Sequence, residues 1–419
     1  MIATKTNIYN KTRVHICVLS IILVLFPIGA ALTGIIGSMS PITLLLALYV
    51  LIAFFNTFNL KRKLNRAIIC VSLYFLYSLV SLLWGAGLIY QGWYVTNILL
   101  NTLVFYMVST DKYSKREICN IRRSVFLGIY LSIIVAVICR ITSKENRLII
   151  SLFSEIDPNE FGFNMCFYAA IVLMDLNSKK GKAKFKDIIL FILLSIIVIL
   201  TGSRGSMLAL GAIFIVWFVV FGKGMKLKII LSAIIILSCL MLLFADSLDS
   251  YMLNRLDIFG SLRSDGGSGR LQIWDAGFQK FKDSNVLQQL FGHGFGTFPN
   301  VVHYIAIGHT KPYEAHNIFI DCLITGGIVG CALLLTAFIS AIVLNYKSKN
   351  IFGVLATIAL LVASMALDLQ NYKAFALVFA VSSIFSQCSE KSNQRSYRDA
   401  IKCNCPDVQN RKVSARLPG

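Results

Sequence analysis

The residues best suited to chemistry lie in four short stretches of a very apolar chain. They are TGSRG at 201–205, Arg270 in GRLQIW, SEIDPNEFG at 154–162, and a His–Asn pair at 316–317. Ionisable side chains at membrane depth are costly, so each one is a functional candidate by default. Arginine suits the binding of an anion, and histidine suits the removal of a proton.

The TGSRG stretch is a tight turn between the seventh and eighth predicted spans. Both spans are near the lower length limit for crossing a bilayer, so we expect the turn at the membrane surface. The guanidinium of Arg204 keeps its charge and matches phosphate oxygens. We assign Gly202, Ser203 and Gly205 to the same substrate-binding turn, because glycines let a phosphate approach the backbone. The alternative is an arginine that extends to the interface from a helix end.

A long exported loop, residues 246–315, separates the ninth and tenth predicted spans. Loops of this length are usually functional, and the aromatic residues in this one argue against disorder. Four apolar residues recur within it at helical spacing: Leu271, Trp274, Phe278 and Phe281. This stripe predicts an amphipathic helix on the outer membrane face. Arg270 borders the stripe and is expected near the lipid headgroups.

The acidic stretch precedes the sixth predicted span. Asp157 and Asn159, on either side of Pro158, are suited to capping the helix that follows. We also assign Asp157 and Asn159 to substrate binding. Glu155 and Asp157 have a spacing that could hold a divalent cation on oxygen ligands. Capping is the favoured interpretation, and we assign no metal ligand.

His316 and Asn317 stand at the start of a predicted span over residues 317–345. On one continuous helix, Gly327 would lie about 20° from His316, and Gly330 about 40° away on the other side. Two glycines four residues apart also allow close helix packing. We therefore predict that His316 faces the protein interior, with Asn317 orienting the imidazole or a bound hydroxyl. The alternative is a histidine that caps the helix at the interface.

The composition indicates an all-α polytopic membrane protein. Of the 419 residues, 57% are hydrophobic and 14% are charged, whereas soluble domains are usually about 45–50% apolar and about 25% charged. Twelve spans are predicted, at 14–33, 41–58, 67–85, 94–110, 124–142, 161–176, 188–203, 206–222, 229–245, 317–345, 351–367 and 373–386.

The net charge of +20 does not indicate a nucleic-acid partner, because its distribution follows the membrane. With a cytosolic N-terminus, most Lys and Arg residues fall on the cytosolic side, as the positive-inside rule predicts. The exported loops at 34–40 and 86–93 carry no charge. Residues 1–386 are then one membrane domain with both termini cytosolic. Residues 387–419 form a basic cytosolic tail that we expect to be disordered.

Three blocks in the same order resemble the O-antigen polymerase/ligase family of bacterial membrane glycan transferases. They are TGSRG, then GRLQIW followed by FGHGFGTF, then His316–Asn317 with Gly327 and Gly330 at their spacings. DPNEFG at 157–162 is similar to a further feature of the family. The resemblance covers roughly residues 150 to 340, whereas the first 140 residues match only as generic spans.

The resemblance implies a GT-C-like enzyme in the cytoplasmic membrane of a bacterium, with its active site on the exported face. It would transfer a glycan from a polyprenyl-pyrophosphate carrier to an acceptor, without a metal or other cofactor. Arg204 and Arg270 would stabilise the leaving pyrophosphate, and His316 would be the general base for the acceptor hydroxyl. Arg270 and the glycines downstream of it depart from the fixed Arg-to-Gly spacing of some polymerases.

Within the family, the acceptor separates a polymerase from a ligase: another carrier-linked glycan, or a lipid core or protein. The His–Asn spacing favours a ligase, whereas related proteins with a GRLQIW-like block often polymerise capsule or exopolysaccharide. We favour a polymerase. Membrane lipids, a flippase and a chain-length regulator are the further partners expected.

Two functions of other kinds stay open. A flippase or exporter would place charges along a pathway inside its spans, where only Asp321 clearly lies. A metal-dependent GT-C enzyme would use Glu155 and Asp157 as its metal ligands.

Overall fold

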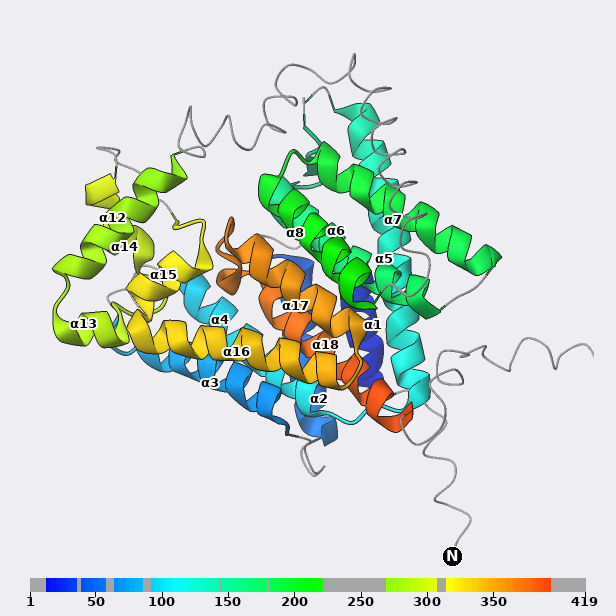
Figure 1. The fold of residues 1–419 in the computed structure, drawn as a ribbon, viewed down its shortest axis with the longest axis horizontal. Coiled ribbons are helices and arrows are strands. Elements are labelled where there is room, and N and C mark those ends of the chain that lie inside the picture. Colours follow the sequence, from blue (N-terminus) through cyan, green and yellow to red (C-terminus); the bar gives the residue numbers. More distant parts are fainter. Residues whose placement is uncertain are drawn as a thin grey trace, which may run out of the picture.

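The computed structural model describes residues 13–35, 39–57, 64–85, 92–143, 145, 147–178, 181–221, 269–306 and 314–392. These residues fold into helices joined by short connections (Figure 1). Before the long loop the helices are α1 (Val14–Leu25), α2 (Pro41–Thr57), α3 (Arg66–Ser81), α4 (Gly92–Thr110), α5 (Lys115–Thr142), α6 (Pro158–Ser178), α7 (Lys182–Leu200) and α8 (Arg204–Val216). The later helices are α12 (Arg270–Asp283), α13 (Val286–Phe291), α14 (Phe298–Ala306), α15 (Ile318–Thr325), α16 (Gly327–Lys347), α17 (Ile351–Ser364) and α18 (Lys373–Ser392).

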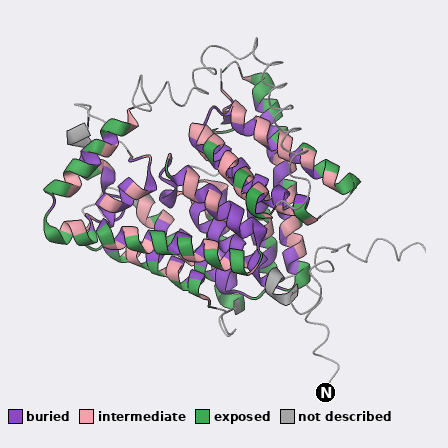
Figure 2. Cartoon of the chain, viewed as in Figure 1, coloured by how far each residue is buried: buried purple, intermediate pink, exposed green. Residues whose placement is uncertain are grey.

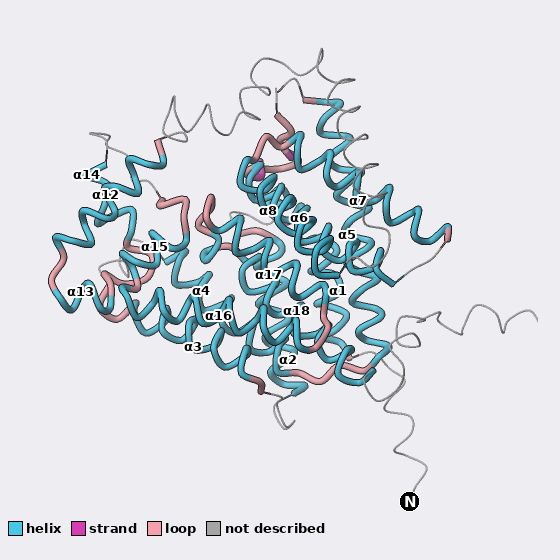
Figure 3. The backbone as a smooth tube through the Cα atoms, in the orientation of Figure 1, coloured by secondary structure: helices cyan, strands magenta, loops and turns pink. Residues whose placement is uncertain are grey.

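A few short elements complete the described fold. The turns η2 (Phe26–Ile28), η3 (Ala30–Leu32) and η6 (Leu369–Asn371) are 3₁₀-helical, and η5 (Trp217–Phe221) continues α8 as a π-helical turn. A hairpin of two short strands, β1 (Ile150–Ser151) and β2 (Glu155–Ile156), precedes α6. It lies at one end of the helices in Figure 3.

The apolar helices identify a multi-pass membrane protein. Within the described residues, four are long and apolar enough to cross a bilayer: α5, α6, α8 with η5, and α16. Shorter apolar helices occupy six further segments. Outward-facing side chains such as Ile141 and Ile339, which are 79% and 61% exposed, form the large apolar surface that soluble proteins avoid. The predicted span at 229–245 lies outside the described residues, and the count of twelve spans stays a prediction.

The core of the bundle lies around α6. In the 18-residue apolar stretch of α6, 83% of the residues are buried inside the protein, against 33% in the corresponding stretches of α8–η5 and α16. A helix that is buried on every side must be apolar nearly all round, and the run Phe161–Leu173 meets that condition except at buried Asn164. Buried residues also gather along α17 and α18, as Figure 2 shows.

Polar side chains gather at two ends of the described bundle. At the first, which we call the basic end, Arg13 donates to Asp111 and Glu117, both over 2.9 Å. Buried His15 pairs with Asp111 over 3.0 Å. The amide of Gln387 also donates to the Asp111 carbonyl. This anchors α18, which continues to Ser392, beyond the boundary predicted at 386; the tail from 393 onward lies outside the described residues.

Helices α12 to α15, which we call the arm, stand at the opposite end. Seven buried residues form a small core that belongs to the arm: Ile273, Ala276, Phe298, Val302, Ala315, Ile320 and Ile324. The predicted helix in GRLQIW is confirmed as α12, and its place on the outer membrane face stays a prediction. Leu271 and Phe278 are exposed, because α12 packs through Ile273 and Ala276 with Trp274 and Phe281 at the edges.

The predicted span at 317–345 is not one continuous helix, because the chain breaks between α15 and α16, and α16 alone is long and apolar enough to cross a membrane. Gly327 has φ +64°, a left-handed conformation that only glycine adopts readily. The GHGFG segment closes the break: the N–H groups of His293 and Gly294 donate to the carbonyls of Ile324 and Thr325 over 2.9 and 2.8 Å. A helical periodicity cannot continue through this break.

Candidate functional site

His316 does not lie on a helix. Its φ is +49° and α15 begins only at Ile318, so the predicted alignment of His316 with Gly327 on one helix face is wrong. The prediction of an inward position fares better, because the residue is half-buried and Ala315 before it is fully buried. A non-glycine residue in this region of φ is uncommon and is often found at a functional site.

Asn317 is the N-cap of α15. Its Oδ1 accepts hydrogen bonds from the N–H groups of Phe319 and Ile320 over 2.9 and 3.3 Å. Such a cap satisfies backbone donors that the first turn of a helix leaves open. The side chain therefore fixes the residue after His316, and this oxygen is engaged in the cap.

Arg270 begins α12, directly after Gly269 with φ +78°. It lies close enough to His316 to influence that imidazole. Burial lowers the pKa of His316 below its ordinary value of about 6.5, Arg270 lowers it further, and the carboxylate of Asp157 opposes both. The structure thus brings together three residues that the sequence singled out separately. The neutral form of the imidazole, which can accept a proton, is the favoured one.

The start of α6 faces the same site. Pro158 occupies the first helical position, and Asp157 accepts hydrogen bonds from the N–H and the side-chain amide of Asn159 over 2.8 and 2.9 Å. The predicted capping role of Asp157 is thereby confirmed, and proline at the first position fits the same helix start. Asp157 remains exposed, so its charge still acts on His316.

The TGSRG turn is closed rather than open to a phosphate. Gly202, Ser203 and Gly205 are all buried, and only Arg204 in the turn reaches partial exposure. Ser203 caps α8 by accepting from the Ser206 N–H over 3.3 Å. A side chain on Gly205 would stand 2.6 Å from the Cβ of Ala366, so this glycine serves close packing. The expected approach of phosphate to the glycine backbone has no open surface here.

Arg204 is nevertheless placed at the same end of the bundle as the other candidates. The hydroxyl of Ser206 donates to the carbonyl oxygen of Asn159 over 3.2 Å, which ties the start of α8 to the start of α6. Arg204 begins α8, so its guanidinium extends from the helix start that lies beside the Asp157 cap.

Several ionisable residues that the sequence reading left out surround the site. The hydroxyl of Tyr94 donates to Glu314 over 3.2 Å, and burial raises the pKa of Glu314 although this bond opposes the shift. Burial and the carboxylates of Glu160 and Glu314 raise the pKa of Tyr372. Lys373, the first residue of α18, lies near Glu160. The signal that could have found Lys373 is a lone charge at the edge of an apolar span.

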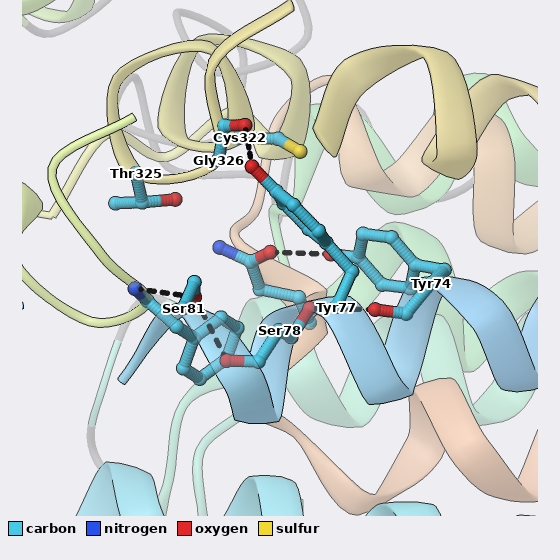
Figure 4. A pocket seen from close by; sticks show the side chains of 9 residues that line it. Tyr74, Tyr77, Ser78, Ser81, Cys322, Thr325 and Gly326 are labelled. Atoms are coloured by element: carbon cyan, nitrogen blue, oxygen red, sulfur yellow. Dashed lines mark hydrogen bonds between the residues drawn. The ribbon is translucent and has the colours of Figure 1, made fainter. Parts of the chain in front are cut away.

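A small polar cavity lies beneath the arm and is too small to be the glycan site. Its lining includes Tyr74, Tyr77, Ser81 and Thr325, and the space open to the centre of a water molecule is about 10 Å³. That is room for about one water. Tyr77 directs its hydroxyl to the carbonyl oxygen of Gly326 over 2.7 Å (Figure 4). The cavity therefore belongs to the packing of α3 against the helix break.

Another histidine of the long loop differs from His316. The Nε2 of His293 lies 2.9 Å from the hydroxyl of Ser284, and that hydroxyl also lies 2.7 Å from the Lys280 carbonyl. Because a hydroxyl has one proton to donate, Ser284 accepts from His293 and is not activated as a nucleophile. His309 and the side chain of His303 lie outside the described residues.

The fold and the site define a multi-pass, all-α membrane protein with arginine, histidine and carboxylate side chains gathered at one end of its bundle. Residues 189–335, from α7 through the arm into α16, match the family model of the O-antigen ligases, which confirms the family resemblance seen in the sequence. The match includes Arg204, Arg270 and His316 and leaves Asp157 outside. No curated protein matches the chain.

Proposed function

We propose that this protein is a polymerase of a surface polysaccharide, such as O-antigen, capsule or exopolysaccharide. It transfers glycan from a polyprenyl-pyrophosphate carrier to a carrier-linked acceptor on the exported face of the cytoplasmic membrane. The observation that carries the proposal is the placement of His316 beside Arg270, with Asp157 on the opposing helix start. The match to the O-antigen ligases supports the class of reaction.

In this reaction the acceptor hydroxyl attacks the anomeric carbon of the donor glycan. The new bond joins the acceptor oxygen to that carbon, and the bond between the carbon and the pyrophosphate oxygen breaks. His316 takes the hydroxyl proton, because its neutral imidazole is favoured in the site. The leaving carrier pyrophosphate gains negative charge, which Arg270 and Arg204 stabilise. Asp157 stabilises the imidazolium that results.

An O-antigen ligase is the second candidate, because the matching family model carries that description. Purified protein with a carrier-linked repeat unit as sole substrate separates the two. A polymerase makes a ladder of products without an added acceptor, whereas a ligase makes none until a lipid core or protein acceptor is supplied. If the protein forms no glycan product with any of these acceptors but moves the carrier-linked glycan across vesicle membranes, a flippase is favoured and the proposal fails.

A further inference from the structure

A tryptophan that the reaction above does not use touches the loop that carries His316. The indole N–H of Trp274 donates a hydrogen bond to the carbonyl oxygen of Ala315 over 2.9 Å. Trp274 is on α12, four residues after Arg270, so the two side chains lie on the same face of that helix. One hydrogen bond thus joins the helix of Arg270 to the residue before His316.

The backbone of His316 needs such support. Its φ of +49° is sparsely populated by non-glycine residues and persists only where neighbouring structure holds it. On one side, Ala315 is fully buried and its carbonyl is bound by Trp274. On the other side, the side chain of Asn317 is fixed by the two backbone N–H groups that it caps. His316 is therefore held from both directions.

Packing within the arm supports this contact. Ala315 belongs to the arm core, and Trp274 and Phe281 of α12 pack against that core. Because Ala315 and Trp274 pack in the same arm core, α12 and the 314–317 loop share one packed unit as well as the hydrogen bond. The indole bond fixes the register between the two within this small unit.

We propose that Trp274 is a positioning residue that sets the imidazole of His316 relative to the guanidinium of Arg270. The inference rests on the proposed function. Trp274 acts through the carbonyl of Ala315 and does not touch the reacting atoms. A misplacement of about 1 Å in such a site can cost about 100-fold in rate.

The test is Trp274→Phe in the full-length protein, assayed with the carrier-linked repeat unit. Phenylalanine keeps most of the apolar contact and removes the N–H donor. We expect kcat to fall about 10- to 100-fold, with KM for the carrier-linked substrate unchanged. We also expect the acid limb of the pH–rate profile to move up, because the imidazole leaves the buried position beside Arg270.

Phe281→Leu is the matched control, because Phe281 packs against the same core and its side chain makes no hydrogen bond to Ala315 in the described residues. It should lower thermal stability and leave the acid limb in place. If Trp274→Phe does not fold, a tryptophan analogue with sulfur in place of the indole N–H keeps the shape and removes the same donor.

A wild-type kcat and acid limb in Trp274→Phe or in the sulfur analogue would overturn the inference. The same holds if Phe281→Leu shifts the acid limb as far as Trp274→Phe does. These outcomes differ from failure of the proposed function, which would appear as full polymerisation by His316→Gln. An inactive His316→Gln together with normal Trp274 variants would remove only the positioning role.

Discussion

His15 and His316 lie at opposite ends of the bundle and in opposite surroundings. His15 is fully buried on α1, and its Nε2 is 3.0 Å from Asp111, which also accepts from Arg13. His316 is half-buried and has a left-handed backbone conformation, and its imidazole makes no hydrogen bond to the residues that the structure describes. At the basic end the carboxylates are paired with Arg13 and with the Nε2 of His15, although the buried Nδ1 of His15 has no hydrogen-bond partner among the described residues. Near the arm, the imidazole of His316 is left available as a proton acceptor.

The electrostatics of the two ends differ in the same way. Burial would raise the pKa of Asp111, but hydrogen bonds and charge from His15 and Arg13 lower it below the ordinary range. At the arm end, burial and Arg270 lower the pKa of His316, and the carboxylate of Asp157 opposes them. A closed ion network contributes stability, and a neutral imidazole beside a guanidinium suits catalysis. Substitutions at the two ends should therefore change different measurements.

The largest effect is expected for His316→Gln. Removing the general base should lower the polymerisation rate by about 10²- to 10⁴-fold, while the melting temperature in detergent stays close to wild type. The reason for the unchanged stability is that this side chain makes no described hydrogen bond. Gel analysis of product length with purified protein measures the rate. If His316→Gln kept more than a tenth of the activity, the proposed difference between the two ends of the bundle would be contradicted.

Arg270→Gln should have the next largest effect on activity. Losing one preorganised charge that stabilises the leaving pyrophosphate should cost about 10²- to 10³-fold in kcat. The same change removes a cause that lowers the pKa of His316, so the acid limb should move toward about 6.5. The sign follows because a base must be neutral to act, and without Arg270 it stays protonated to higher pH. Lys280→Gln, near the other end of α12, should shift neither quantity.

Asp111→Asn should affect the amount of folded protein instead of turnover. Breaking a buried ion pair costs about 3–5 kcal/mol of stability. Because Arg13 keeps its ion pair with Glu117, we expect the free energy of unfolding to fall by about 3 kcal/mol. Because the folded-state pKa of Asp111 lies below its unfolded value of about 3.9, its contribution is present above that pH and is lost on further acidification. Thermal unfolding at several pH values tests this. A fall in kcat per folded molecule would contradict the division between the two ends.

Long apolar runs were sufficient to predict most of the described helices, and apolar periodicity was sufficient to predict α12. The cap at Asp157 was also predictable, because a capping residue before proline has a local physical cause. The break after Thr325 was not, since glycines at helical spacing look the same in one helix as in two. Only the backbone contact with the GHGFG segment decides it, and that contact is tertiary.

The same limit applies to the site. His316, Arg270 and Arg204 stood out by type, and the family match covers all three. Trp274 looked like one more member of an apolar stripe, because its partner Ala315 lies 41 residues further on. Tyr372 and Lys373 belong to a different helix start and approach Glu160 only in the folded bundle. Spacing along the chain carries no information on such tertiary contacts.

The smallest effect is expected for Ser203→Ala, and it separates two interpretations of the TGSRG turn. As a buried cap of α8, Ser203 should contribute about 1 kcal/mol to stability, with kcat and KM near wild type. Ser203→Gly should cost only a few tenths of a kcal/mol, because glycine tolerates the cap position. If the turn instead cradled a phosphate, Ser203→Ala would raise KM for the carrier-linked substrate at unchanged stability. That result would reopen the turn as a substrate contact and leave Arg204 as part of a larger anion site.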